Sequence, residues 1–339
     1  MEVNIVKFFQ KASCSFLDGV NSVITVIGET SMLFMLFVAI YLCYRKEFAV
    51  KYLFFFMLSG LINGAIKSAV ARPRPYTYDG VLDVRHTTGY SFPSGHSQNY
   101  ALQATLIGIE YSKYEKRNSK RWILYSSLIV VGLLVAISRI YLGQHFLTDV
   151  LVGLCLGTIL AFGFETLFNL IPQKFKKIVT TQSVLLGLIP IAMILIVIIE
   201  YLNLGSESML DMFYTYLAIY VGLVVGYSVD KAYINYKEDA VWYVQLCKIV
   251  IAVLGIVTLS FAFDWVSNQV VRNFYFYLTS TLYVTLVLPL LFKLIFKDKY
   301  LKQEKVKVVK NKKNKKDKEN INQEDSTDIV EVEFEKENN

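Results

Sequence analysis

The chain has 339 residues, 54% of them hydrophobic, and a formal net charge of +7. Apolar runs of roughly 17 to 23 residues recur along it, and a helix of that length crosses a hydrocarbon core about 30 Å thick. This pattern excludes an ordinary soluble enzyme and predicts an all-α, polytopic bundle of membrane helices. Lys and Arg gather in short loops and in the C-terminal tail, so membrane topology explains the charge, and nucleic acid is not expected as a partner.

The first segment, residues 1–20, has apolar residues that fit an amphipathic helix lying on a membrane surface. It lacks the basic start and unbroken apolar core of a signal peptide, so no cleaved leader is expected. Nine membrane spans are predicted to follow, at about residues 28–44, 52–70, 98–111, 122–140, 147–171, 184–202, 212–229, 244–263 and 274–296. No CxxC spacing occurs, and neither a disulfide nor a metal site is expected from the cysteines Cys14, Cys43, Cys155 and Cys247.

The orientation of the spans is predicted from the basic loops, because short loops rich in Lys and Arg stay on the cytoplasmic side. Such loops, alternating with loops poor in base, lie at residues 45–51, 113–121 and 174–177. The loop 71–97 is the exception, since it carries Arg72, Arg74 and Arg85 on the predicted extracytoplasmic side. We interpret these arginines as groups that bind an anion.

The tail, residues 297–339, is first basic and then acidic, a composition that cannot bury a core and predicts disorder. Nine crossings place it in the cytoplasm, where its basic half would meet anionic lipid. Glu110 and Glu165 fall within predicted spans. We expect them to pair with basic residues or to lie at the membrane interface, and not to form a proton relay.

Polar and ionisable residues gather in three clusters at the ends of apolar runs, where they are costly unless they are functional. The clusters are KSAVARPRP from Lys67, PSGH from Pro93 and SRIYLGQHFLTD from Ser138. If residues 145–149 are helical, His145 and Asp149 share a face, and the carboxylate accepts a hydrogen bond from the imidazole. The second ring nitrogen is then an oriented nucleophile or base. A polar pair at a helix end is the alternative explanation of this spacing.

The three clusters also contain cationic side chains and backbone hydrogen-bond donors. Three cationic side chains that suit phosphate oxygens are Lys67, Arg74 and Arg139. In PSGH, Gly95 permits close backbone approach, so the amides near Ser94 and Gly95 and the Ser94 hydroxyl can donate to an oxyanion. His96 can give a proton to a departing oxygen. Neither a metal nor another cofactor is expected to take part.

These residues resemble the three-part signature of the type 2 phosphatidic acid phosphatase (PAP2) superfamily. The matching positions are Lys67, Arg74 and Pro75, then Pro93, Ser94, Gly95 and His96, then Ser138, Arg139, His145 and Asp149. The resemblance covers residues 21–203 and implies a six-helix catalytic core, with about three additional spans in residues 204–296. It also implies a metal-independent phosphatase acting through a phosphohistidine. In that scheme His145 is the nucleophile, Asp149 orients it and His96 is the acid. The phosphoryl group would be held by Lys67, Arg74, Ser94, Gly95 and Arg139.

The leading hypothesis is therefore an integral lipid phosphatase of the cell membrane, with its site on the extracytoplasmic face. A polyprenyl diphosphate such as undecaprenyl diphosphate is the favoured substrate, because recycling of carrier lipid needs an outward-facing phosphatase. Phosphatidic acid and phosphatidylglycerol phosphate are the alternative substrates. A lipid phosphotransferase with the same site, or a transporter, is less favoured, because the sequence offers no acceptor motif and no repeated broken spans. Lateral packing or a homodimer is the expected role of the last three spans.

Overall fold

The computed structural model describes residues 1–172, 193 and 207–295. Its helices are α1 (Glu2–Gln10), α2 (Ser15–Val26), α3 (Thr30–Cys43), α4 (Lys46–Val70), α5 (Gly95–Tyr114), α6 (Asn118–Tyr141), α7 (Leu147–Leu170), α10 (Glu207–Val229), α11 (Trp242–Phe263) and α12 (Gln269–Leu282). A 3₁₀ turn, η1 (Pro75–Thr77), and two π-helical turns, η2 (Asp230–Ile234) and η3 (Tyr283–Val287), complete them. Every regular element in the described residues is helical, which confirms the all-α prediction. The predicted span 184–202 and the tail 297–339 lie outside the described residues.

Six helical spans of the described residues are long and apolar enough to cross a membrane. They are α4, α6, α7, α10, α11 and the span Gln269–Ile295, which begins with α12 and continues through η3. A seventh crossing requires α2 and α3, which meet at a bend of 47°, to form one span. Helix α5 matches the third predicted span but is less apolar, because α4, α6 and α7 enclose it and it carries buried Gln98 and Gln103. An enclosed helix needs no apolar surface toward lipid, which explains why its hydropathy is weak.

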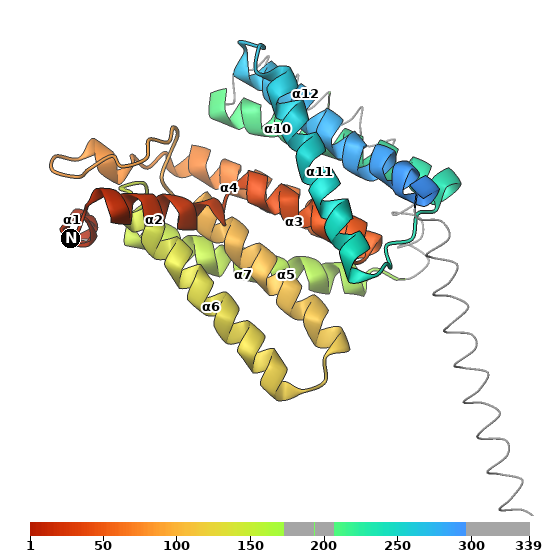
Figure 1. Ribbon diagram of the computed structural model, residues 1–339. Helices are drawn as coiled ribbons and strands as arrows, with labels where there is room; N and C mark the ends of the chain where they lie inside the picture. The colour runs from red at the N-terminus through yellow and green to blue at the C-terminus, as the bar shows by residue number, and fades with distance from the viewer. Residues whose placement is uncertain (173–192, 194–206, 296–339) are drawn as a thin grey trace, which may run out of the picture.

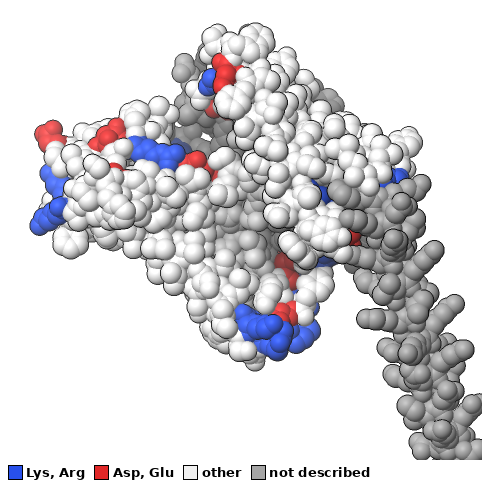
Figure 2. Space-filling view, in the orientation of Figure 1, with Lys and Arg blue, Asp and Glu red and all other residues white. Residues whose placement is uncertain are grey.

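Large apolar side chains lie exposed along the outer helices. On α6 they include Ile123, Ile129 and Leu133, and on α11 they include Leu254, Val257 and Phe261. Figure 2 shows the long sides of the helices largely without charged residues in this view. Exposed apolar surface of this extent is stable in lipid and unstable in water, so it agrees with an integral membrane protein.

The helices form two layers in Figure 1. One layer comprises α3 to α7, with α5, α6 and α7 below α3 and α4, and the other comprises α10, α11 and α12 on the opposite side of α3 and α4. The first helix, α1, contacts α6 and α7, and α2 packs along α6. The largest apolar core lies between the two layers and includes Phe37, Phe56, Ile219 and Leu288. The N-terminal segment 1–20, expected as one amphipathic helix on the membrane surface, is divided between α1 and the first part of α2, and the buried Val6 of α1 packs against protein.

Glycines permit the closest helix contacts, as is usual in membrane bundles. A β-carbon on Gly153 of α7 would lie 2.6 Å from the carbonyl oxygen of Ser94, and one on Gly157 would collide with the carbonyl of Gln98. These two glycines therefore let α7 lie directly against the beginning of α5. The contact joins the PSGH segment to the segment that follows α6.

Charged residues concentrate at the end of the bundle where α5 ends and α6 begins, as Figure 2 shows. Glu110 pairs with Arg45 at 2.8 Å, and Glu165 pairs with Lys51 at 2.6 Å and with Lys113 at 2.9 Å. The expectation that both glutamates are paired is confirmed.

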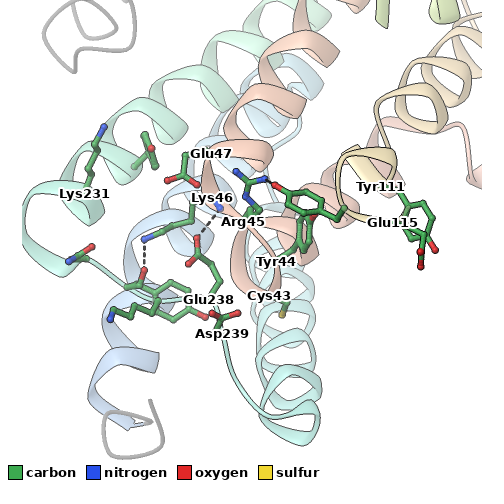
Figure 3. A pocket seen from close by; sticks show the side chains of 15 residues that line it. Cys43, Tyr44, Arg45, Lys46, Glu47, Tyr111, Glu115, Lys231, Glu238 and Asp239 are labelled. Atoms are coloured by element: carbon green, nitrogen blue, oxygen red, sulfur yellow. Dashed lines mark hydrogen bonds between the residues drawn. The ribbon is translucent and has the colours of Figure 1, made fainter. Parts of the chain in front are cut away.

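The same end carries a pocket of about 910 Å³, between the α3–α4 turn and the segment after η2 (Figure 3). Beside it, Lys46 Nζ lies 2.8 Å from the buried Asp230 carboxylate, and the Lys46 amide donates to Glu238. These bonds tie α4 to the C-terminal helices at the end of the bundle opposite the PSGH segment.

Candidate active site

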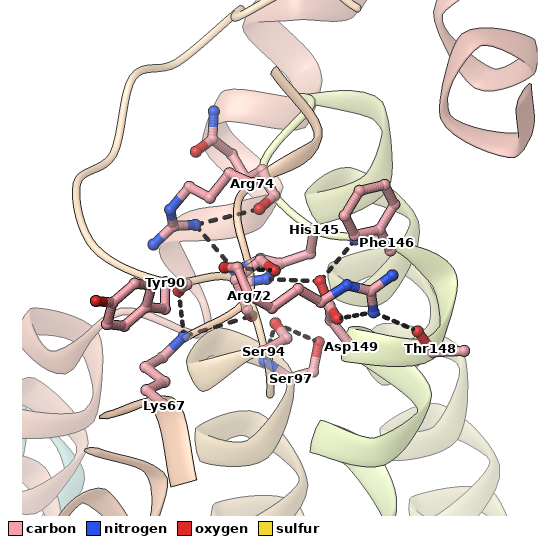
Figure 4. Close-up of polar contacts among 12 residues, drawn as sticks. Lys67, Arg72, Arg74, Tyr90, Ser94, Ser97, His145, Phe146, Thr148 and Asp149 are labelled. Carbon is pink, nitrogen blue, oxygen red and sulfur yellow. Dashed lines mark hydrogen bonds and ion pairs between the residues drawn. The ribbon is translucent and has the colours of Figure 1, made fainter. Parts of the chain in front are cut away.

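The predicted site residues come together at one end of the bundle, where α4 ends, α5 begins, α6 ends and α7 begins (Figure 4). The chain reverses between α6 and α7 at Gly143, whose φ of +73° suits glycine. The segment 71–94 covers this end, and its Arg72 carbonyl accepts from the Ser91 amide at 2.9 Å. Lys67 and Asp149, which are 82 positions apart in the sequence, therefore face the same small volume.

His145 and Asp149 lie close together, but the predicted hydrogen bond within one helix is wrong. His145 precedes α7, and only Asp149 belongs to its first turn. The distance from His145 Nδ1 to Asp149 Oδ2 is 3.7 Å, and Nδ1 has no hydrogen-bond partner among the described residues. The carboxylate instead accepts from the Phe146 amide at 2.9 Å, because a first-turn carboxylate caps the free amides of a helix. The pair is still close enough for the carboxylate to stabilise positive charge on the imidazole.

Arg72 is a site residue that sequence reasoning missed. Its Nη1 donates to Asp149 Oδ1 at 2.7 Å and to Thr148 Oγ1 at 2.8 Å, and its guanidinium carbon lies 4.1 Å from the centre of the Phe146 ring. It also pairs with Glu2 of α1. The sequence predicted that the arginines of this loop bind an anion, and the anion that Arg72 binds is the carboxylate of Asp149. Only the fold brings the two together, so the spacing in the sequence gave no signal.

Lys67 and Arg74 lie on one side of His145 in Figure 4, with Asp149 on the other. Arg74 Nη1 lies 3.5 Å from His145 Nε2 and donates to the Gln144 carbonyl at 3.2 Å. The carbonyls of residues 88–91 hold both cations, since Arg74 donates to Thr88 and Gly89 at 2.7 and 2.8 Å, and Lys67 to Tyr90 at 2.7 Å. Two cations beside a histidine nitrogen form a site for an anion with several oxygens.

The PSGH segment forms the beginning of α5. Ser94 is the N-cap residue, and its hydroxyl accepts from the Ser97 amide at 3.4 Å and the Ser97 hydroxyl at 3.1 Å. Its amide donates to the Asp149 carbonyl at 3.0 Å, so the expectation of a free Ser94 amide is wrong. The amides of Gly95 and His96 belong to the first turn of α5, whose amides lack intrahelical partners and favour anions.

Arg139 is placed differently from the other cations. Its side chain is 1% exposed, and its Nη1 donates to Thr25 of α2 at 2.9 Å. Its Nε has no hydrogen-bond partner among the described residues. The carbonyl of Arg139 accepts from the His145 amide at 3.3 Å. Arg139 therefore fixes the backbone of the nucleophile candidate and keeps a buried, unpaired donor, but no hydrogen bond joins its side chain to His145.

The electrostatics of the site favour neutral His145. Burial holds the pKa of His145 well below its usual value, and the charges of Arg139, Lys67 and Arg74 lower it further. A neutral imidazole has a lone pair on one nitrogen, and because Nε2 faces Arg74 while Nδ1 faces Asp149, the two nitrogens are suited to different roles. The arrangement can bind an oxyanion at Nε2 and stabilise charge at Nδ1.

Comparisons with known proteins find similar sequences and structures. Residues 48–171 match the model of the PAP2 superfamily, and residues 214–299 match the model of the PAP2 superfamily phosphatase, transmembrane extension. A phosphatidylglycerophosphatase B of Bacillus subtilis is 36% identical over 47% of this chain and 80% of its own length. A dolichyldiphosphatase of Saccharomyces cerevisiae is 28% identical over 30% of this chain and 44% of its own length.

Among solved structures, a transmembrane PAP2 type phosphatidylglycerolphosphate phosphatase from Bacillus subtilis is similar, with 31% identity and a TM-score of 0.45. The match covers 51% of this chain and 86% of that one. The second family match falls on α10, α11 and α12, which the resemblance of the motifs did not cover. The family is shown by the family model and by the phosphatidylglycerophosphatase B of Bacillus subtilis, of which this chain covers 80%. The chain belongs to the PAP2 superfamily of membrane phosphatases.

Proposed function

We propose that this protein is a lipid phosphatase that forms a phosphohistidine at Nε2 of His145. One observation carries the proposal: the buried His145 presents Nε2 to Arg74 at 3.5 Å and Nδ1 to Asp149 at 3.7 Å. A phosphoryl group held by Arg74 and Lys67 would meet the lone pair of Nε2. Asp149 would stabilise the positive charge that the imidazole gains in the reaction.

The reaction has two steps. First, Nε2 of His145 forms a bond to phosphorus while the bond from phosphorus to the lipid oxygen breaks, and His96, which must be protonated once the anionic substrate is bound, gives its proton to that oxygen. Second, a water attacks phosphorus and loses a proton to His96, and the bond from phosphorus to Nε2 breaks. Inorganic phosphate leaves, and both histidines return to their starting states.

Charge neutralisation is assigned to the protein's own groups. Lys67, Arg74 and the first-turn amides of α5 would bind the equatorial oxygens, whose charge is the main demand of phosphoryl transfer. Arg139 would join them by turning its unpaired Nε toward the phosphate. We therefore propose that the reaction needs no metal.

The proposed location is the cell membrane, with the site on the extracytoplasmic face and the tail in the cytoplasm. The basic turn between α5 and α6 lies at the opposite end of these helices from His96 and His145, and basic short loops favour the cytoplasmic side. The substrate is proposed to be a lipid phosphate or diphosphate. A polyprenyl diphosphate, favoured from the sequence, and phosphatidylglycerol phosphate each correspond to the activity that a relative's name gives.

Phosphate release by the detergent-purified protein tests the proposal. The substrates are a polyprenyl diphosphate, phosphatidic acid and phosphatidylglycerol phosphate, each with and without EDTA. We expect release from at least one lipid, undiminished by EDTA, and loss of at least a hundredfold in His145→Ala. The matched control is His86→Ala, because His86 is exposed and pairs with Asp83 in the covering loop. Equal release by His145→Ala and His86→Ala would contradict the proposal.

A further inference from the structure

A pocket of about 440 Å³ adjoins the proposed catalytic groups on the side of His96. One wall comes from α4 and α5 and includes Asn63, His96 and Asn99. The opposite wall comes from the C-terminal helices, with Met212 and Tyr216 on α10 and Tyr277 on α12. The pocket is therefore built jointly by the segment that carries the motifs and by the extension that does not.

The packing of α10 on α4 fixes the second wall. Gly60 and Gly64 lie one turn apart on α4, and a β-carbon on Gly60 would collide with the Tyr216 ring and hydroxyl. A β-carbon on Gly64 would lie 2.5 Å from the Met212 methyl carbon. The Tyr216 ring also stands edge-on to Phe56, with 5.7 Å between ring centres. Gly60 and Gly64 thus let α10 pack directly on α4, with Tyr216 over Gly60 at the pocket.

Tyr277 is fixed from the other side. Its ring packs edge-on against Phe34 of α3, with 5.7 Å between ring centres. Helix α12 is itself held against α10, where a β-carbon on Gly222 would lie 2.8 Å from Thr281. Both tyrosine rings are therefore positioned by packing, which leaves their hydroxyl groups available for a ligand.

Most polar groups of the pocket are hydroxyl and amide groups, and two of the hydroxyl groups are unpartnered among the described residues. In the described parts of the chain, neither the Tyr216 nor the Tyr277 hydroxyl has a hydrogen-bond partner. Asn63 donates through its Nδ2 to Gln98 at 2.7 Å, which leaves its Oδ1 directed toward Gly95. Of the described residues that line the pocket, none is Lys or Arg, and the one acidic residue, Glu29, pairs with Arg85 at 2.7 Å.

The in-line geometry of phosphoryl transfer relates this pocket to the substrate. In phosphoryl transfer the nucleophile and the leaving oxygen lie roughly in line on opposite sides of phosphorus. His145 occupies one side, and His96, the proposed acid for the leaving oxygen, lines the pocket. The group attached to the leaving oxygen must therefore begin at the pocket.

We propose that this pocket binds the leaving group of the lipid, and that Tyr216 and Tyr277 of the C-terminal extension hydrogen-bond to a hydroxyl on that group. The proposal rests on the phosphatase function proposed above. Uncharged donors and acceptors suit a glycerol-type headgroup. The second phosphate of a polyprenyl diphosphate, which leaves as part of the polyprenyl monophosphate, would find neither Lys nor Arg among the described lining residues and would lie near Glu29. The pocket thus favours phosphatidylglycerol phosphate over the polyprenyl diphosphate preferred from the sequence.

The ratio of kcat/KM for phosphatidylglycerol phosphate to that for phosphatidic acid tests the assignment, because the second lipid lacks the headgroup hydroxyl. We expect the full-length wild-type protein to prefer phosphatidylglycerol phosphate. The double variant Tyr216→Phe with Tyr277→Phe keeps both rings, and its ratio should fall about tenfold through loss of two hydrogen bonds. Asn99→Ala probes the opposite wall and should lower the ratio in the same direction. Tyr283→Phe is the control, since its hydroxyl donates to Ile251 away from the pocket and its loss should leave the ratio unchanged.

The outcomes separate this assignment from the function on which it rests. A lower ratio in the double variant, with an unchanged ratio in Tyr283→Phe, would support it. An unchanged ratio in the double variant, or a wild-type preference for polyprenyl diphosphate, would overturn the pocket assignment and leave the phosphatase function standing. Release from none of the three lipids would overturn both.

Discussion

At the scale of single residues, the two nitrogens of His145 have different neighbours. Nε2 faces Arg74, and Nδ1 faces Asp149, whose other oxygen is bound by Arg72 at 2.7 Å. The carboxylate is therefore held between an arginine and the imidazole. Because Arg72 fixes Asp149, it is a positioning residue whose effect reaches His145 only through the carboxylate.

Removal of Arg72 should slow the enzyme by freeing Asp149. In Arg72→Ala we expect kcat to fall about tenfold or more, because a charge-assisted hydrogen bond to a buried carboxylate is lost. The pH profile should change as well, since an unpaired carboxylate binds a proton more readily and the acid limb of kcat should move to higher pH. Arg72→Lys should restore part of the rate. The exposed Arg117→Ala at the far end is the control, and an identical loss in both alanine variants would contradict the role.

The pH dependence follows from the lowered pKa of His145. The neutral imidazole is the reactive form in the proposed mechanism, and burial, followed by the nearby cations, lowers the pKa of His145 well below the usual histidine value of about 6.5. Activity that depends on neutral His145 is thus retained as pH falls through 6.5 and is lost only at lower pH. Measurement of kcat/KM against pH should show this acid limb below 6.5. Lys67→Gln removes one cation and should move the limb upward; an acid limb of the wild type above 6.5 would contradict the account.

The composition of the site was predictable from the sequence, but its contacts were not. The three clusters identified Lys67, Arg74 and His145, since ionisable residues at membrane depth are rarely without function. The spacing of His145 and Asp149 suggested a shared helical face, whereas Gly143 allows a turn and α7 begins only after His145. The geometry of the local turn decides whether His145 lies within the helix or before it, and a spacing of four residues fits both arrangements. Arg72 was missed because its partner lies far along the chain.

At the scale of helices, α7 positions the site by lying close to α5. Gly153 and Gly157 face the carbonyls of Ser94 and Gln98, and no larger residue fits there. Helix α5 itself has weak hydropathy because other helices enclose it, so composition alone underrates it as a membrane helix. The sequence predicted both helices to within a few residues at each end, while their contact depended on two glycines without an evident motif.

A side chain at Gly153 should separate these helices. In Gly153→Leu the β-carbon would lie 2.6 Å from the Ser94 carbonyl, so we expect destabilisation of about 1–3 kcal/mol together with loss of phosphate release. Gly163→Leu is the matched control on the same helix, because the space around Gly163 is open to 4 Å. Thermal unfolding in detergent measures the difference. Equal unfolding temperatures for the two variants would contradict the importance of this contact.

At the scale of the whole molecule, the two ends of the bundle differ in chemistry. One end carries ion pairs such as Lys51 with Glu165, and the other carries the cations, histidines and carboxylate of the site. The apolar character of most spans followed from the sequence, but the predicted number of nine crossings is not reached in the described residues, where six spans are long and apolar enough, or seven if α2 and α3 form one. The packing of the C-terminal helices on α4 did not follow from the sequence, because it depends on the fit of Tyr216 over Gly60, a contact between residues 156 positions apart.

The orientation of the bundle gives a prediction for intact cells. In a cysteine-free background, Tyr78→Cys in the covering loop should react with a membrane-impermeant thiol reagent added outside. Arg117→Cys, at the basic turn, should react only after the membrane is permeabilised, because the basic turn is expected in the cytoplasm. Both positions are exposed in the structure. The reverse pattern would place the site inside the cell.

Trapping of the covalent intermediate tests the central claim most directly. Wild-type protein is mixed with a lipid substrate carrying ³²P in its terminal phosphate, quenched in alkali within one turnover, and analysed for label on the protein. We predict label that survives alkali and is lost in acid, as a phosphoramidate bond requires, and that is absent in His145→Ala but present in His86→Ala. Rapid phosphate release with no labelled protein at any time, or label that persists in His145→Ala, would contradict the phosphohistidine mechanism.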